Sequence, residues 1–122
     1  MSEYELADLI ASYSNASMAA MTLYLTAVTA YLVAAFTAGE RLSTRQVFIV
    51  NGLFVFVACF FLYGTVGYFY RAFEYVQDLR LLDPDRRLTL NIETITFIAT
   101  VELLGIFAAL YFMWNVRHPK SE

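Results

Sequence analysis

The chain has almost none of the side chains that hold cofactors or carry out acid–base catalysis. His118 is the only histidine, Lys120 the only lysine and Cys59 the only cysteine among 122 residues. A single chain therefore cannot provide a haem site with two histidines, a lysine Schiff base inside a helix bundle, a cysteine–histidine metal site or an internal disulfide. Glycine-rich phosphate loops and the HExxH and GxSxG signatures are also absent. We expect no cofactor, no metal and no enzymatic activity, and we expect Cys59 to be a small buried side chain.

Charged residues are also scarce, and they are not clustered. Eight Lys and Arg stand against eleven Asp and Glu, which gives a net charge of −3. Nucleic-acid binding requires clustered positive charge, so no nucleic-acid partner is expected. Hydrophobic residues make up 60% of the chain, against about 45–50% in ordinary soluble domains. A fold of this size cannot bury so much apolar surface, so we expect a lipid bilayer to cover the remainder.

Three long apolar runs predict an integral membrane protein. Residues 9–39 and 46–70 contain no charged side chain, and residues 94–116 contain only one. Each run exceeds the roughly 20 residues that a helix needs to cross a bilayer, and none has the alternating pattern of a membrane barrel strand. We predict one all-α domain, residues 1–122, with transmembrane helices at about 9–38, 46–70 and 94–116 in an antiparallel up-down-up bundle.

The expected helix ends carry recognisable capping residues. Gly39 is a natural stop for the first helix, and Ser43 with Gln46 has the form of a capping box that opens the second. Helical spacing of apolar residues continues after Tyr70, so the second helix should extend beyond the bilayer, within a water-facing segment at 71–93, until Pro84 ends it. Asn91 can cap the third helix.

Polar and small residues mark two helix faces for packing. Along the first helix they recur at intervals of three and four, as Ser12, Asn15, Ala19, Thr22, Thr26 and Thr29. We expect this set to face protein, because small and hydroxyl residues are typical of contacts between membrane helices. In the second helix Asn51, Ala58 and Thr65 recur every seven residues and predict a seam with the first helix, while Gly64 and Gly67 offer a second close-approach surface.

Glu102 is the one charged residue inside an apolar run. It lies about three residues, or roughly 4.5 Å, from the centre of its span, where a charged carboxylate costs about 2.5–3.5 kcal/mol. The neighbouring small residues Ala99, Gly105 and Ala109 leave room for another helix. No lysine or arginine lies at that depth, so the candidate hydrogen-bond partners are side chains with hydroxyl or amide groups. These candidates are Thr22, Thr26, Thr29, Asn51 and Thr65.

Orientation is weakly specified, because positively charged residues flank both sides of the membrane equally. Four lie on each side: Arg41, Arg45, Arg117 and Lys120 against Arg71, Arg80, Arg86 and Arg87. The segment before the first helix is acidic and contains no Lys or Arg, which favours an N-terminus outside the cytoplasm of a bacterial-type inner membrane. Aromatic residues near the span ends fit the headgroup region; they are Tyr68, Tyr70, Tyr111 and Trp114.

Three functional interpretations follow. In the first, the chain acts through helix–helix association, as a homo-oligomer or an accessory subunit of a membrane complex, and Glu102 fastens helices together. In the second, several copies form a proton or cation pathway that uses Glu102. In the third, the chain permeabilises membranes, since three short spans with an outside N-terminus are similar in layout to one class of phage holins. The C-terminal tail departs from that class because it lacks a strongly basic character.

Overall fold

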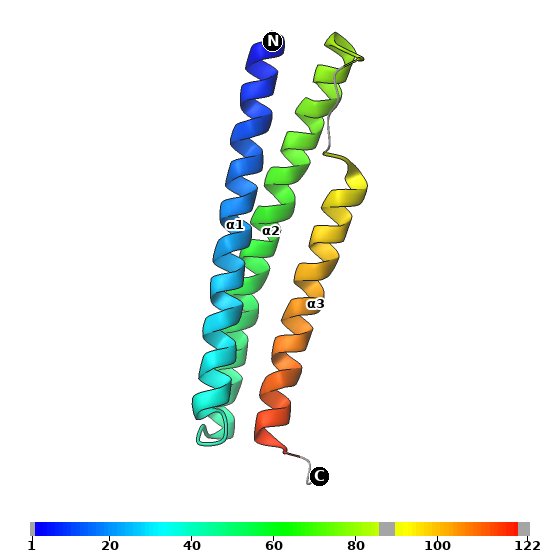
Figure 1. The fold of residues 1–122 in the computed structure, drawn as a ribbon. Coiled ribbons are helices and arrows are strands. Elements are labelled where there is room, and N and C mark those ends of the chain that lie inside the picture. The colour runs from blue at the N-terminus through cyan, green and yellow to red at the C-terminus, as the bar shows by residue number, and fades with distance from the viewer. Residues whose placement is uncertain (1, 86–89, 120–122) are drawn as a thin grey trace.

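The computed structural model describes residues 2–85 and 90–119, and these form three helices (Figure 1). They are α1 (Glu3–Ala38), α2 (Thr44–Leu82) and α3 (Ile92–Arg117). All three are long and apolar enough to cross a membrane, which is compatible with a multi-pass membrane protein. Three basic residues of the orientation comparison, Arg86, Arg87 and Lys120, lie outside the described residues.

The helix ends form where the capping residues predict them. Ser43 and Gln46 make both bonds of a capping box, at 3.2 Å from the Gln46 amide to Ser43 Oγ and 2.9 Å from the Ser43 amide to Gln46 Oε1. Asn91 Oδ1 accepts from the Thr94 amide at 2.8 Å. The second helix stops at Leu82, just before Pro84, as predicted. These ends are set by local chemistry, which is why the sequence identifies them.

Two of the helices extend beyond the third. In Figure 1, α1 and α2 lie side by side along their whole lengths, whereas α3 begins well below the upper end of α2. In this upper region Tyr13 of α1 stacks on Tyr75 of α2 with ring centroids 5.7 Å apart, and Leu79 is fully buried. The extension predicted for the second helix is therefore paired with α1, whose first turns cover it.

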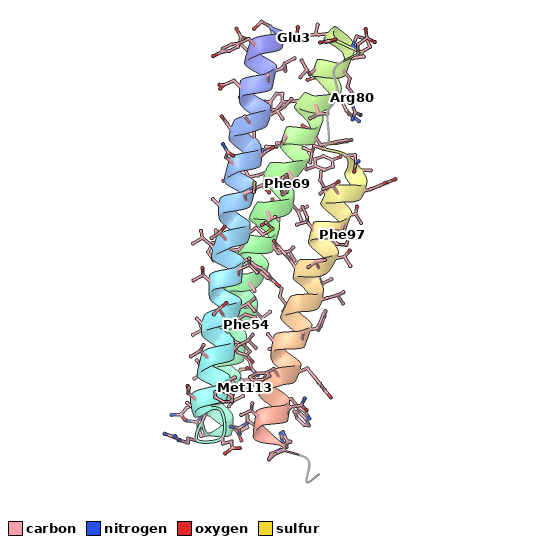
Figure 2. All side chains as sticks on the ribbon, in the orientation of Figure 1. Glu3, Phe54, Phe69, Arg80, Phe97 and Met113 are labelled. Carbon is pink, nitrogen blue, oxygen red and sulfur yellow. The ribbon has the colours of Figure 1, made fainter. Side chains whose placement is uncertain are left out.

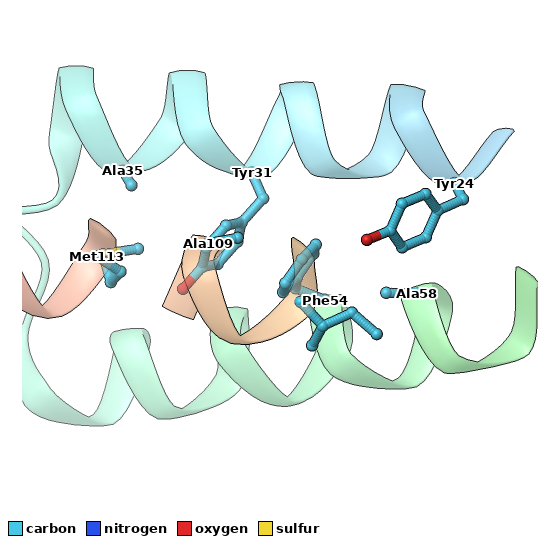
Figure 3. Packing of buried hydrophobic residues seen from close by; sticks show 8 residues of the cluster. Tyr24, Tyr31, Ala35, Phe54, Ala58, Ala109 and Met113 are labelled. Atoms are coloured by element: carbon cyan, nitrogen blue, oxygen red, sulfur yellow. The ribbon is translucent and has the colours of Figure 1, made fainter. Parts of the chain in front are cut away.

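The core lies between all three helices in the lower part of the molecule (Figure 3). Its centre is a stack of Tyr31 on Phe54, with ring centroids 4.1 Å apart and ring planes at 15° to one another. Small residues around this stack let the helices approach one another. The buried cluster consists of Tyr24, Tyr31, Ala35, Phe54, Ala58, Ile106, Ala109 and Met113.

Large apolar side chains cover the outside of the molecule. Figure 2 shows side chains projecting from every helix, and among them Phe97 of α3 is 69% exposed. Exposed apolar patches on this scale require a hydrophobic environment or a partner. The prediction that Cys59 is buried is wrong, because Cys59 lies on the outer face of α2. In a helix that is apolar on all faces, the residues around an outward position are as apolar as those around a core position, so the sequence does not distinguish the two.

One side chain ties the end of α3 to the turn between α1 and α2. A guanidinium nitrogen of Arg117 donates to the carbonyl oxygens of Gly39 and Leu42, at 2.9 and 2.6 Å. Gly39 has ordinary right-handed helical geometry, with φ of −58°, so its lack of a side chain serves close approach. A Cβ there would lie 3.0 Å from Val116 Cγ1 of α3 and would also collide with the Ala35 carbonyl.

Candidate functional site

Glu102 lies on the inner face of α3, in the middle of the three-helix region. Helical spacing places it on the same face as Ile95 and Ile106, and its own side chain is only 3% exposed. The residues before and after Glu102 on this face are apolar. Among the described residues, Glu102 is the one buried acidic residue. An unpaired charge in such a place is costly, since burial removes the hydration of the carboxylate.

The carboxyl group has no hydrogen-bond partner among the described residues. Both of its oxygens are buried, and neither meets a donor or acceptor with bonding geometry. Thr65 of α2 lies next to the carboxyl group, but its hydroxyl donates to the Phe61 carbonyl at 2.8 Å. A Thr65 oxygen can accept a bond only if Glu102 carries a proton, because a carboxylate has no hydrogen to donate.

The backbone of Glu102, in contrast, is bonded to another helix. Tyr24 of α1 donates its hydroxyl to the Glu102 carbonyl oxygen. The hydroxyl reaches this oxygen through the space that Gly105 leaves open, since a Cβ at Gly105 would collide with it. Gly105 thus admits a tyrosine from the same chain. The sequence indicated room for a neighbouring helix at this position, without identifying the group that occupies it.

A second polar contact joins α1 to α2 nearby. Ser17 is fully buried, and its Oγ donates to the Thr65 carbonyl at 2.5 Å. Together Ser17, Tyr24, Thr65 and Glu102 bring polar atoms from all three helices into the interior, and we call them the central polar cluster. Sequence reasoning identified Thr65 and Glu102 but missed Ser17 and Tyr24. Their signal is a spacing of seven residues along α1, which Tyr31 continues.

Asn51 is engaged elsewhere. Its side-chain oxygen accepts from the Tyr31 hydroxyl at 2.6 Å. This bond is part of the seam between α1 and α2 that the spacing of Asn51, Ala58 and Thr65 predicts, and Ala58 and Thr65 are fully buried in it. The prediction that Asn51 bonds Glu102 is wrong, because neither carboxyl oxygen of Glu102 has a hydrogen-bond partner among the described residues.

The small and polar residues that recur along α1, which we call the α1 stripe, lie away from Glu102; they are Ser12, Asn15, Ala19, Thr22, Thr26 and Thr29. Thr22, Thr26 and Thr29 are exposed on the outer face of α1, where they line a shallow surface hollow. Thr22 and Thr26 donate their hydroxyls to carbonyls of the preceding turn, both at 3.0 Å. The prediction that these residues bond Glu102 is wrong. Ser12, Asn15 and Ala19 are exposed too, so the stripe does not face the other helices of this chain, and that it faces protein stays a prediction about a partner.

The small residues singled out for packing have different environments. Ala109 is buried against the other helices and Ala99 is half-buried. A Cβ at Gly64 would lie 3.6 Å from the Ala20 Cβ, an ordinary contact, so the helices do not require glycine there. A Cβ at Gly67 would meet nothing within 4 Å, so the space beside this glycine is open.

Comparisons with protein-family models, with curated proteins and with solved structures found no match. The case for a function therefore comes from the geometry of the described residues.

Proposed function

We propose that the chain is a non-enzymatic membrane subunit that acts by packing against other membrane helices, as a homo-oligomer or as an accessory subunit of a larger complex. It spans the bilayer as an antiparallel up-down-up bundle. The end that bears Arg41, Arg45 and Arg117 faces the cytoplasm, which places the N-terminus outside. One observation supports this function above the others: the α1 stripe is exposed on the outside of the bundle.

The exposed stripe has the chemistry of a helix–helix contact. Lipid tails solvate large apolar side chains as well as a protein does, whereas a face of Ala, Ser and Thr gains from a second helix because backbones can approach closely. The hydroxyls of Thr22 and Thr26 are already bonded within α1, so a partner can cover them without leaving them unsatisfied. The stripe is a packing surface that α2 and α3 do not use.

The position of Glu102 supports packing over transport. Both carboxyl oxygens are sealed inside one chain, whereas a shared pathway would present the acid to a water-filled space between copies. The proton or cation pathway has one observation in its favour, which is that the buried acid has no bonding partner among the described residues. Flux through liposomes that Glu102→Gln abolishes without changing assembly would favour the pathway instead.

The stripe can be tested by measuring assembly in mild detergent. Thr26→Leu adds a bulky side chain to the stripe, and we expect it to shift the protein from its native assembly to a smaller species, as measured by size-exclusion chromatography with light scattering. Leu104→Ala is the matched control on the outer face of α3, where the side chain is 61% exposed. This control should leave the assembly unchanged.

Two outcomes would count against the proposal. If Thr26→Leu and the parent chain give the same assembly in membranes and in detergent, the stripe is not a contact surface. If the parent chain is not retained in the membrane fraction after washing with carbonate, membrane insertion itself is wrong.

A further inference from the structure

A groove runs between α1 and α2 on the outside of the molecule. Its volume is about 630 Å³. The floor consists of small residues from both helices, which are Ala16, Ala19, Ala20, Gly64 and Gly67. The hollow is open and unfilled at Gly67, where an added Cβ would meet nothing within 4 Å. The two helices touch beneath it, because a Cβ at Gly64 would lie in ordinary contact with Ala20.

The walls of the groove are apolar and aromatic. Phe60 and Tyr63 of α2 line it and are 64% and 81% exposed. No acidic residue lines this groove among the described residues. An apolar channel of this kind suits a hydrocarbon chain.

One end of the groove carries a positive charge. Arg71 lines it there, with its guanidinium carbon 6.0 Å from the centre of the Tyr13 ring. Arg71 hydrogen-bonds to Tyr13, and the charge of Glu74 adds a weaker attraction. Glu74 lines an adjoining hollow that shares Tyr63, Gly67 and Arg71 with the groove. A guanidinium has five N–H donors, so Arg71 can bind an anion in addition to its contact with Tyr13.

The length of the groove matches one leaflet of a bilayer. Arg71 is the first charged residue after the apolar run 46–70, so in a membrane it lies at the headgroup level. Phe60, at the other end of the groove on α2, is eleven residues away, or about 16 Å along a helix. The hydrocarbon core is about 30 Å thick. The groove thus reaches from the headgroup region to about the midplane.

We propose that this groove binds one anionic phospholipid, with an acyl chain on the Ala and Gly floor and the phosphate on Arg71. The inference rests on the membrane insertion proposed above. Basic pockets between membrane helices recognise anionic headgroups. A helix from a second copy fits less well, because a helix is about 10–12 Å across and would rest on Phe60 and Tyr63, whereas a single hydrocarbon chain reaches the floor.

Native mass spectrometry of the detergent-solubilised protein provides the test. The probes are phosphatidylglycerol and phosphatidylcholine with identical acyl chains. We expect the parent chain to retain one phosphatidylglycerol in preference to phosphatidylcholine. Arg71→Gln should reduce that preference about fivefold, the effect of one basic side chain at an anionic surface. Arg41→Gln is the matched control, since Arg41 is an exposed arginine in the turn between α1 and α2 and does not line the groove.

A second variant tests the acyl chain separately from the charge. Gly67→Leu should fit the fold, because space is open at that Cβ, and it should lower binding of both phospholipids while Arg71 is intact. Equal retention of the two phospholipids by the parent chain, or no effect of either variant, would overturn the lipid site. If Gly67→Leu breaks up the assembly and leaves lipid binding unchanged, the groove holds a protein helix instead. None of these lipid-binding results tests the proposed packing function. That proposal is tested separately by the assembly measurement and the carbonate wash described above.

Discussion

At the scale of single residues, Gly105 and Tyr24 form the most specific contact in the molecule. The Tyr24 hydroxyl reaches the Glu102 carbonyl only because Gly105 has no side chain. The contact therefore depends on two residues 81 positions apart in sequence, one on α1 and one on α3. The Tyr24 hydroxyl is the group that requires glycine at position 105. Replacing Tyr24 by phenylalanine should therefore make a side chain at position 105 less destabilising.

Gly105→Ala should destabilise the protein by about 1–3 kcal/mol, the usual cost of overpacking a filled interior. Tyr24→Phe should cost about 1 kcal/mol through the lost hydrogen bond. The double variant should be more stable than the sum of these two costs predicts, because phenylalanine leaves room for the alanine methyl. Thermal unfolding of the four proteins in detergent measures the coupling, and strictly additive effects would contradict the contact.

Glu102 presents the opposite case, a polar group without a described partner. Its carboxyl oxygens are buried and unbonded, and burying a polar group without a hydrogen bond costs about 1–3 kcal/mol in proteins. Glu102→Leu should therefore raise the unfolding temperature in detergent, whereas Glu102→Gln should leave it close to that of the parent chain. The bond from Tyr24 survives both changes, since it is made to the backbone. A lower unfolding temperature for Glu102→Leu would show that the carboxyl group makes a stabilising bond.

At the scale of helices, α3 has its own attachment to the α1–α2 turn. Arg117 supplies two hydrogen bonds to that turn, and hydrogen bonds from a charged donor contribute about 1.5–3 kcal/mol in sheltered positions. Arg117→Gln should lower stability by about 1 kcal/mol, because the site is only half-buried. Trp114, the only tryptophan, lies on the last turns of α3 and can report its release by fluorescence. Arg45→Gln, an exposed arginine at the same end, should have no effect.

Helix positions and ends are predictable from the sequence, but helix rotation is less so. Apolar length identifies α1, α2 and α3, and the capping groups of Ser43 and Asn91 act within one turn of themselves. The spacing of the α1 stripe predicts a face that contacts protein, but it does not show that this face points away from α2 and α3. The hydroxyls of Thr22 and Thr26 bond to carbonyl oxygens of their own helix. These bonds form whether the threonines lie inside a bundle or on its surface. The spacing of the threonines therefore identifies a helix face but not what covers that face.

At the scale of the whole molecule, the interior polar contacts were only partly foreseeable. Glu102 stands out in an apolar run, but the partner of its backbone is a tyrosine from the face of α1 opposite to the stripe. A tyrosine in a membrane helix can lie at the headgroups, in lipid or inside the protein, so Tyr24 carries no distinctive signal alone. The sequence predicts Arg117 only as a charge that flanks the third helix, since nothing in its local sequence shows that the α1–α2 turn lies within reach.

The side-by-side pairing of α1 and α2 along their whole lengths has a consequence for biogenesis. The two helices are joined by the short turn 39–43, so α1 and α2 leave the ribosome before α3 and are the first pair able to form. In the proposed membrane protein, a lone α3 would bring Glu102 into lipid at a cost of about 2.5–3.5 kcal/mol if charged. The order of synthesis thus makes the α1–α2 pair, which shelters this acid, before the helix that carries it.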